Sequence, residues 1–459
     1  MENITIEACA AEGKALTHWN GVVVFVPFAV PGDVVDIRVT KKSKNYYEGF
    51  VERIVTPSKD RLEPFCQHFG VCGGCKWQPL PYPMQLEAKR QQVYDQLVRI
   101  GHLNVPEIRP TIPSDKIQYY RNKLEFTFSS KRWLLKDEDI ESVPENDRMG
   151  LGFHVGKFFD KVLDIKHCYL QKDPSNDIRL FIKKYAVENG LDFFDIRQNV
   201  GYVRNMFIRT TDTGDLMVIM CFFYENREDR EKMLDAIAEA FPQITSLYYI
   251  INNKLNDSIG DQECILYKGE PTIRETMESL TFRIGPKSFY QTNSEQAYKL
   301  YSVARDFAEL TGNEIVYDLY TGTGTIAQFV SGKAAKVVGI EYVPEAIEDA
   351  KVNAAGNGIT NCEFFAGDMK DVLRRDFINE HGQPDVIILD PPRAGIHQDV
   401  AKVILEASPA RMVYVSCNPA SQARDLALFA DKYDITAVQP VDMFPHTQHV
   451  ENVCALRLR

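Results

Sequence analysis

The chain has 459 residues, of which 44% are hydrophobic and 25% charged, so it is long enough for about three globular domains. Its formal net charge of -11 argues against nucleic-acid binding through a global positive field, but it does not exclude a local basic groove. No apolar run approaches the roughly 18 residues that span a bilayer, and the acidic first residues do not resemble a signal peptide. Ten cysteines without an export signal then favour reduced thiols in the cytoplasm over a disulfide framework.

Residues 1–58 show the alternation and turn signals of a small OB-like β-barrel. Strands are expected at residues 4–8, 22–27, 34–40 and 50–55, with a turn at 31–33. Between two of these strands, residues 41–47 interleave lysines with tyrosines, which suits phosphate contacts and base stacking in RNA. The alternative interpretation of this segment is a solvated hairpin tip.

Residues 59–284 predict a central α+β domain that starts with a cysteine-rich loop. A helix is expected at about residues 82–100, and whether it packs on the C-terminal domain is left open. Strands are expected at residues 123–130, 206–211 and 216–223. A second basic patch, at residues 120–123 and 131–132, is interpreted equally well as an RNA contact and as a solvated strand edge.

Residues 285–459 alternate short apolar strands with helical segments, the pattern of a Rossmann-like, doubly wound parallel sheet. The expected strands are residues 314–319, 336–341, 362–366, 385–389 and 412–416. Two further strands, 434–443 and 452–459, are joined by a loop too short for a crossover helix. They are therefore expected to pair antiparallel at the edge of the sheet.

A glycine-rich turn, residues 318–325, follows the first strand of that sheet and predicts a cofactor site. Gly322 and Gly324 allow close approach of a ligand, Tyr320 lies in the same turn, and Glu341 ends the next strand, where a carboxylate can hold ribose hydroxyls. A nicotinamide dinucleotide is one candidate. The missing third glycine, the antiparallel hairpin and the lack of a hydride-transfer site favour S-adenosylmethionine. A turn used only for packing is the other alternative.

Upstream of the sheet, Gln291 lies in a short polar segment, residues 289–293, before a helix. Its side chain could hydrogen-bond the amino-acid end of the cofactor. Sequence physics alone favours a simpler role, because Thr292, Asn293 or Ser294 would cap the helix.

Three reactive side chains are expected at the carboxyl ends of the C-terminal strands, where open α/β sheets bind ligands. Cys417 ends one strand as a candidate nucleophile, and a helix after Pro419 is expected to lower its pKa. Asp390 ends another strand and Glu451 precedes the last one, so both are candidate proton handlers. The alternatives are an inert buried cysteine, a turn-capping aspartate and a surface glutamate.

These motifs together resemble the RNA uracil-C5 methyltransferases. The resemblance rests on residues 416–419, 390–393, 449–451 and 289–293, on the glycine turn, and on the cysteine spacing. It is greatest to the 23S ribosomal RNA (uracil-5-)-methyltransferases that carry an iron–sulfur cluster and a TRAM barrel, and it covers nearly the whole chain. One departure is Thr325, which stands where relatives often have asparagine.

The resemblance implies that S-adenosylmethionine is the methyl donor and that RNA, first of all 23S ribosomal RNA, is the substrate, with transfer RNA as the alternative. Cys417 would add to C6 of a flipped uracil and Glu451 would remove the C5 proton. Asp390 would bind the uracil edge near the cofactor, and Arg393 a phosphate or the base. Cofactor contacts are expected from the set Gln291, Tyr320, Gly322, Glu341 and Asp390.

Cys66, Cys72 and Cys75 form a C-x5-C-x2-C spacing, and Cys168 is the remote fourth cysteine. Four thiolates suit a [4Fe–4S] cluster or a structural zinc ion, and spacing does not separate the two. The resemblance favours the [4Fe–4S] cluster, in a structural role.

Two rival functions stay open at this point. An S-adenosylmethionine-dependent N-methyltransferase would use residues 390–392 to hold an exocyclic amine, but such enzymes usually have an aromatic residue where this chain has Arg393. A non-catalytic iron–sulfur RNA-binding protein is the second rival. Neither rival requires a nucleophilic Cys417.

Overall fold

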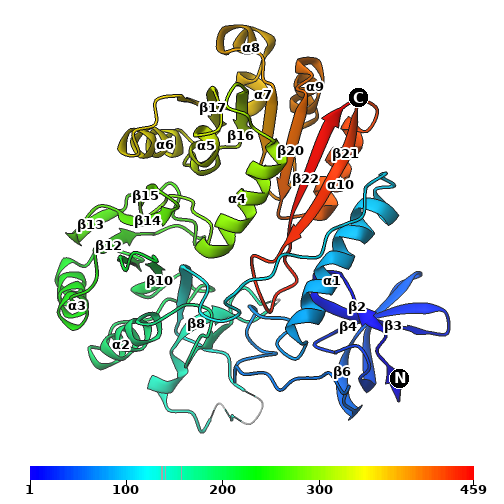
Figure 1. Cartoon of the computed structure of the whole chain (residues 1–459). Coiled ribbons are helices and arrows are strands. Elements are labelled where there is room, and N and C mark those ends of the chain that lie inside the picture. Colours follow the sequence, from blue (N-terminus) through cyan, green and yellow to red (C-terminus); the bar gives the residue numbers. More distant parts are fainter. Residues whose placement is uncertain (136–137, 140, 157) are drawn as a thin grey trace. The chain divides into compact units, whose positions relative to one another are not determined.

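The computed structural model describes residues 1–135, 138–139, 141–156 and 158–459 (Figure 1). The chain forms two compact units. The first contains Met1–Pro64, Lys76–Ile117 and Glu295–Arg459, and the second contains Phe65–Cys75 and Gln118–Ser294. This division differs from the predicted segments 1–58, 59–284 and 285–459, because residues 76–117 belong with both chain ends. In the part of the chain described, no helix is long and apolar enough to cross a membrane.

The N-terminal part of the first unit is a six-stranded sheet around a small apolar core that includes Val24, Val26 and Ile37. The strand predicted at residues 4–8 is divided into two short strands, because the chain changes partner: the Ile6 N–H donates to the Asp33 carbonyl at 2.8 Å, and the next N–H, that of Glu7, donates to the Leu16 carbonyl at 2.9 Å. A strand at Lys14–Trp19 was not predicted. In sheet order the strands are β1 (Ile4–Thr5), β5 (Val34–Lys42), β6 (Tyr46–Thr56), β4 (Val22–Pro27), β3 (Lys14–Trp19) and β2 (Ala8–Cys9), with a 3-10 turn η1 (Ala11–Gly13) before β3.

The predicted helix at 82–100 is confirmed as α1 (Tyr82–Tyr94) followed by a π-helical turn η2 (Asp95–Ile100). Val93 and Leu97 of this helix are fully buried in one cluster with side chains of the C-terminal sheet. The helix therefore packs on that sheet, which is why residues 76–117 belong to the first unit.

The C-terminal sheet has seven strands, of which five are parallel (Figure 1). The last strand lies between the fifth strand and the edge strand, antiparallel to both, so the predicted antiparallel tail is confirmed. The all-apolar β19 sits near the middle and is buried on both faces. In sheet order the strands are β18 (Cys362–Ala366), β17 (Lys336–Glu341), β16 (Ile315–Leu319), β19 (Val386–Leu389), β20 (Arg411–Ser416), β22 (Glu451–Leu458) and β21 (Tyr433–Val441).

Helices alternate with these strands as predicted and pack against the sheet. The parallel strands end at one edge, so residues that follow them in sequence meet there. The helices are α4 (Ser294–Ala308), α5 (Thr325–Ser331), α6 (Pro344–Gly356), α7 (Met369–Val372), α8 (Arg375–His381), α9 (Gln398–Ala407) and α10 (Pro419–Phe429).

The second unit is a mixed α+β structure whose seven-stranded sheet includes all three strands predicted for this region. In sheet order its strands are β13 (Ile265–Gly269), β12 (Ser246–Ile251), β11 (Leu216–Phe222), β10 (Val203–Thr210), β7 (Lys123–Ser129), β8 (Gly150–His154) and β9 (Val162–Asp164). The remaining elements are α2 (Ser175–Glu188), α3 (Arg227–Ala240), the 3-10 turn η3 (Glu145–Arg148) and the hairpin of β14 (Ile273–Met277) and β15 (Leu280–Ile284).

Candidate active site

Cys417 lies in the two-residue step between the end of β20 and the start of α10. Its neighbour Asn418 caps the helix, because the Asn418 side-chain oxygen accepts a hydrogen bond from the Ala420 N–H at 3.2 Å. The Asn418 amide also donates to the Arg393 carbonyl at 3.1 Å. The cap therefore ties the segment after β19 to the end of β20, beside a half-buried thiol.

Glu451 is the first residue of β22, and only 6% of its surface is exposed. The antiparallel register of β20 and β22 pairs Ser416 with Asn452. One step further along both strands, this register brings Cys417 opposite Glu451. The predicted nucleophile and the predicted base therefore lie at the end of the same strand pair.

Asp390 directly follows β19, and its N–H donates to the Leu319 carbonyl, at the end of β16, at 3.4 Å. Its carboxyl group is close enough to the Cys417 thiol and the Glu451 carboxyl to raise the pKa of both. Asp318, at the start of the glycine turn, acts on Asp390 in the same way. Asp390 thus lies between the predicted cofactor turn and the Cys417–Glu451 pair.

Both carboxyl groups are shifted toward neutral pH. Burial raises the pKa of Glu451 to about 8, the charge of Asp390 adds to the shift, and Arg393 opposes it. Burial also raises the pKa of Asp390 to about 7, with a further contribution from Asp318. Carboxyl groups with such pKa values can accept and return protons near pH 7, as general bases do.

The pKa of the Cys417 thiol is raised overall. The helix that was expected to lower it is present as α10, but burial dominates and raises the pKa of the thiol, and the nearby Glu451 charge adds to this shift. Arg393 lowers it, both through its charge and through a hydrogen bond to Cys417. The cation that favours the thiolate is therefore Arg393, which was predicted to contact a phosphate or the base of the RNA.

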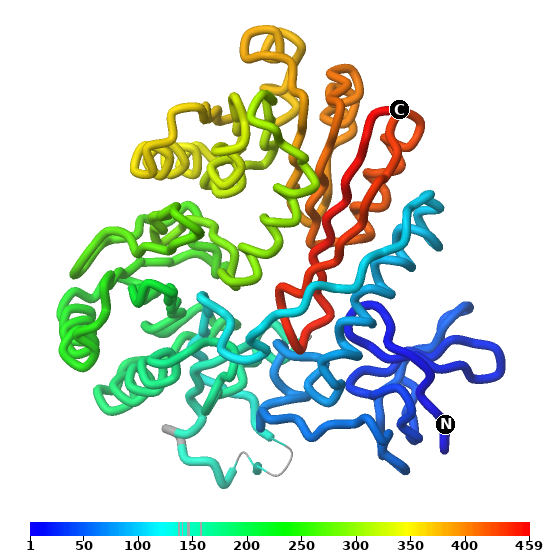
Figure 2. Tube along the Cα trace, viewed as in Figure 1, coloured from blue at the N-terminus to red at the C-terminus, as the bar shows by residue number. Residues whose placement is uncertain are grey.

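The loop between β21 and β22 carries two histidines with different surroundings. His449 accepts a hydrogen bond at its Nδ1 from Nη2 of Arg393 at 2.9 Å. His446 is buried, and burial lowers its pKa to about 4. Its N–H donates to Oε1 of Gln85 in α1 at 2.8 Å, and its carbonyl accepts from the Lys76 and Trp77 N–H groups. These hydrogen bonds make His446 a packing residue of the loop (Figure 2 shows this loop in red beside α1 in blue).

The two glycines of the predicted cofactor turn are in different environments. Gly322 and Gly324 both have positive φ, at 54° and 74°. A Cβ on Gly324 would lie 2.9 Å from Ala350 and from Phe364, so this glycine is needed for packing. A Cβ on Gly322 would meet nothing within 4 Å. Gly322 therefore borders open space, as a turn that admits a ligand requires.

Glu341, at the end of β17, is held at the same turn. Its Oε2 accepts from the Gly322 N–H at 3.1 Å and its Oε1 from the Val343 N–H at 3.1 Å. Tyr320, with a positive φ of 69°, is partly buried, and its phenol pKa rises to about 12, chiefly by burial. The structure thus brings Tyr320, Gly322 and Glu341 together, as the sequence predicted.

Two carboxylates around this turn, Asp318 and Asp368, were not among the predicted site residues. Asp318 is fully buried, its Oδ2 accepts from the Thr321 hydroxyl and the Ala327 N–H, and burial raises its pKa to about 7. Asp368 follows β18, caps α7, and is near enough to Tyr320 to raise its pKa. The position of Asp368 after a parallel strand, like that of Glu341, was a signal available in the sequence.

Gln291 belongs to the second unit, where its carbonyl accepts from the Asn122 side chain at 2.8 Å. The helix that the sequence placed after it begins at Ser294 as α4. Thr325, the departure from the family pattern, is the first residue of α5 and is buried, 3.4 Å from the Thr323 hydroxyl.

The four predicted metal ligands all belong to the second unit. Burial raises the pKa of Cys72 to about 12 and that of Cys168 to about 11. The charges of Cys66 and Cys75 add to both shifts, and that of Cys168 adds to the shift of Cys72. The four sulfur atoms are therefore near one another. Among the residues described, however, no three histidine, cysteine or acidic side chains are close enough to hold a metal ion as they stand.

The lysine–tyrosine segment at 41–47 is a hairpin tip between β5 and β6. Lys41 lies over the Tyr46 ring at 5.4 Å and Lys42 over the Tyr47 ring at 5.7 Å. In the other basic patch, Lys131 pairs with Asp195 at 2.8 Å, and Arg132 pairs with Glu138. The lysines of the hairpin tip thus lie over aromatic rings, whereas Lys131 and Arg132 are paired with carboxylates.

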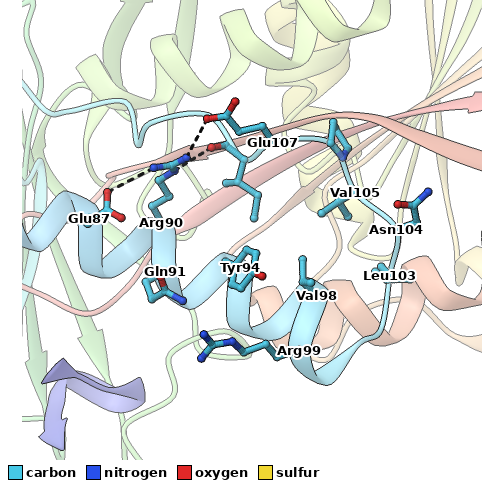
Figure 3. Close-up of a pocket in the computed structure, with 12 residues that line it drawn as sticks. Glu87, Arg90, Gln91, Tyr94, Val98, Arg99, Leu103, Asn104, Val105 and Glu107 are labelled. Carbon is cyan, nitrogen blue, oxygen red and sulfur yellow. Dashed lines mark hydrogen bonds and ion pairs between the residues drawn. The ribbon is translucent and has the colours of Figure 1, made fainter. Parts of the chain in front are cut away.

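A cavity of about 500 Å³ lies between α1 and residues 103–108 (Figure 3). On its wall, Arg90 donates to the Ile108 carbonyl at 2.9 Å and pairs with Glu107 at 3.4 Å. The predicted catalytic and cofactor residues are not among those that line it. This cavity is therefore separate from the site around Cys417.

Comparison with known families gives two matches. Residues 209–459 match the family model described as tRNA (uracil-5-)-methyltransferase. Residues 2–51 match the TRAM domain.

Similar proteins match along nearly the whole chain. A protein of Porphyromonas gingivalis named "Uncharacterized RNA methyltransferase" is 58% identical over 455 residues, covering 97% of this chain and 98% of its own. A protein of the same name from Bacteroides thetaiotaomicron is 58% identical over 453 residues, covering 98% of this chain and 100% of its own. The solved tRNA (uracil-54, C5)-methyltransferase of Pyrococcus abyssi, in complex with S-adenosyl-L-homocysteine, is 28% identical with a TM-score of 0.76, over 99% of this chain and 100% of its own.

Proposed function

The chain belongs to the tRNA (uracil-5-)-methyltransferase family, and from that premise we propose that it methylates C5 of one uridine in RNA through a covalent bond from Cys417. The family match and the TRAM match confirm the resemblance inferred from the sequence motifs. The single observation that carries the proposed mechanism is the placement of Cys417 opposite Glu451, with Asp390 beside both.

C5 of uracil is a poor nucleophile until a group adds to C6. The Cys417 thiolate forms an S–C6 bond, which pushes electron density onto C5 as an enolate and makes that carbon nucleophilic. Asp390, half-buried beside the thiol, is the proposed hydrogen-bond partner of the uracil edge. A uracil reaches this site only if it leaves its stack, so base flipping is part of the proposal.

Glu451 acts after methyl transfer. Its carboxylate takes the proton from C5, and the electron pair left on C5 forms the C5–C6 double bond as the S–C6 bond breaks and the thiolate leaves. The raised pKa of Glu451, about 8, suits this task, because the proton is taken up strongly and is later lost to water. Arg393 stabilises the Cys417 thiolate before it attacks C6 and again when it is released.

S-adenosylmethionine is the methyl donor of this family, and bound in the site it supplies an electrophilic methyl group. The open space at Gly322 and the carboxylate of Glu341 fit this cofactor, since a ribose can approach the turn and hydrogen-bond the carboxylate. Tyr320 lies near both Glu341 and Asp368. Gln291 and Asp390 complete the proposed contact set.

Incubation with RNA that carries 5-fluorouridine tests the proposed function. Fluorine at C5 cannot be removed as a cation by Glu451, so the protein–RNA bond formed through Cys417 persists after methyl transfer. We expect a denaturation-resistant adduct that requires S-adenosylmethionine and disappears in Cys417→Ala. An N-methyltransferase would transfer methyl groups without an adduct, and a non-catalytic RNA-binding protein would give neither.

We propose 23S ribosomal RNA as the substrate, on the basis of the TRAM domain combined with the cysteine spacing. Transfer RNA is the second candidate, since the Pyrococcus abyssi relative is named as a tRNA (uracil-54, C5)-methyltransferase and matches over nearly the whole chain. Mapping 5-methyluridine in both RNA classes from a deletion strain separates the two. Loss of the mark from ribosomal RNA alone supports the first.

We also propose that Cys66, Cys72, Cys75 and Cys168 hold a [4Fe–4S] cluster. Their thiolates repel one another, and a cationic iron core would relieve that repulsion. The backbone around them is already ordered, since Asn176 accepts from the Cys168 N–H at 2.8 Å. Iron and sulfide analysis of anaerobically purified protein tests this proposal. Four iron atoms per chain support it, and stoichiometric zinc without iron contradicts it.

A further inference from the structure

We propose that His449 is a positioning residue: as the neutral tautomer with its proton on Nε2, it holds the Arg393 guanidinium beside the Cys417 thiol. The inference extends the proposed role of Cys417, but its test measures the thiol directly and does not depend on methyl transfer. If the proposed function failed, the electrostatic arrangement could still be verified.

The contact between the two side chains assigns the tautomer. Nη2 of Arg393 lies 2.9 Å from Nδ1 of His449. A guanidinium has only donors, so the imidazole nitrogen must be the acceptor and carries no proton. The remaining proton of a neutral imidazole is then on Nε2. A doubly protonated His449 would have no acceptor for Arg393 and would repel it.

The Arg393 side chain also acts on the Cys417 thiol, whose pKa it lowers through its charge and through a hydrogen bond. The groups that act on this thiol are Glu451 from β22, Asp390 from the segment after β19, and Arg393 itself. Both carboxyl groups disfavour the thiolate, and Arg393 is the one cation among the three. Holding the guanidinium in place therefore increases the fraction of thiolate at neutral pH, against the larger effect of burial.

Arg393 needs such support because its side chain is exposed. An exposed arginine samples several rotamers, and solvent weakens its electrostatic effect. Its backbone is fixed through the Asn418 amide, but its guanidinium is fixed only where it meets an acceptor such as His449. A fixed guanidinium loses less entropy when it binds the thiolate than a mobile one.

His449 is in turn held by its own loop. Its N–H donates to the Thr447 hydroxyl at 3.3 Å, and its ring lies 6.4 Å from the Phe444 ring, nearly perpendicular to it. The Thr447 hydroxyl donates to the Phe444 carbonyl at 2.8 Å. The His449 imidazole thus belongs to a turn whose backbone is held by its own hydrogen bonds.

The test is the pH dependence of Cys417 alkylation by iodoacetamide in the full-length protein, read out on the Cys417 peptide by mass spectrometry. In His449→Leu we expect the apparent pKa of Cys417 to rise by about 0.5–1 unit, and the alkylation rate at pH 7.5 to fall roughly 3–10-fold. His449→Asn should stay within about twofold of wild type, because its amide oxygen replaces Nδ1 as the acceptor. His18→Leu, on the exposed barrel surface, controls for loss of a histidine.

A double-mutant cycle separates positioning from a general effect on folding. Arg393→Gln should slow alkylation at least as much as His449→Leu, and the double variant should be no slower than Arg393→Gln alone. If the His449→Leu profile coincides with wild type, or if the two effects are additive, His449 does not act through Arg393 and the proposal is wrong. If His449→Asn behaves like His449→Leu, the acceptor at Nδ1 is not what matters, which also overturns it.

Discussion

Gln422 of α10 and Asn452 of β22 are joined side chain to side chain, with Nδ2 of Asn452 donating to Oε1 of Gln422 at 2.7 Å. Gln422 also donates to the Asn452 carbonyl at 3.1 Å and to the Tyr414 carbonyl at 3.0 Å. It is fully buried. One side chain therefore links β20 and β22 near the ends that carry Cys417 and Glu451, and we expect it to support the spacing of the two.

Gln422→Leu should consequently slow methylation up to about 100-fold while leaving S-adenosylmethionine binding near wild type, since a misplacement of about 1 Å can cost that much. Buried groups left without partners should also reduce stability by about 1–3 kcal/mol. Turnover and calorimetric cofactor titration measure the two effects. Gln243→Leu, at an exposed position, is the control. Wild-type turnover in a folded Gln422→Leu protein would show that the link is not needed.

Glu451→Gln should make the protein more stable at alkaline pH. The folded-state pKa of Glu451, about 8, is raised above its ordinary value of 4.5. The wild type therefore has its full contribution from this group below pH 4.5, and loses it as the pH rises to about 8. Glutamine cannot ionise, so the stability gain of the variant should grow between these pH values and then level off.

Denaturant unfolding of both proteins at pH 5, 7 and 9 measures this difference. Glu406→Gln, at an exposed position of α9, should show little change across the series. A constant difference between Glu451→Gln and wild type at all three pH values would mean that the carboxyl group titrates normally.

Alanine at the two glycines should have different consequences. Gly322→Ala should weaken S-adenosylmethionine binding with only about 1–2 kcal/mol of backbone cost, because its Cβ would enter open space at positive φ. Gly324→Ala should chiefly lose stability, since its Cβ would overlap Ala350 and Phe364. Calorimetric titration and thermal unfolding separate the two. Unchanged affinity in Gly322→Ala would indicate a turn used only for packing.

Lys89 and Asp442 form a fully buried ion pair between α1 and the loop that leads to Glu451. Tyr82 donates to the same carboxylate at 2.8 Å. Lys89→Met should cost about 3–5 kcal/mol, because Asp442 is left buried without its cation. The double variant with Asp442→Leu should recover much of that loss. Urea unfolding measures the series, and a Lys89→Met protein as stable as wild type would contradict the expected cost.

The sequence predicted those parts of the fold in which local pattern and burial agree. The strands at 336–341 and 362–366 lie where they were expected. In the first, four consecutive residues are buried, and a parallel strand buried on both faces appears as an apolar run. The strand at Lys14–Trp19 has no such run, since its inward residues include the small Ala15 and the polar Thr17. This segment is a strand because it pairs with β4, and its own residues give no signal of that pairing.

The arrangement of the units could not be predicted from composition. Residues 76–117 belong with the C-terminal sheet because Val93 and Leu97 complete its core, a contact between distant parts of the chain. In the site, residue identity was enough to nominate Cys417 and Glu451. The raised pKa of the thiol and the role of His449 follow from burial and from a hydrogen bond across the β21–β22 loop, and neither has a sequence signal.

Release of tritium from RNA labelled at C5 of uridine tests the central claim most directly. Methylation at C5 by the proposed route must expel the C5 hydrogen after Cys417 has added to C6. We predict one tritium released per methyl group transferred by wild type, none above background in Cys417→Ser, and strongly slowed release in Glu451→Gln. Methyl transfer to RNA without tritium release, or release by Cys417→Ser at the wild-type rate, would contradict the account.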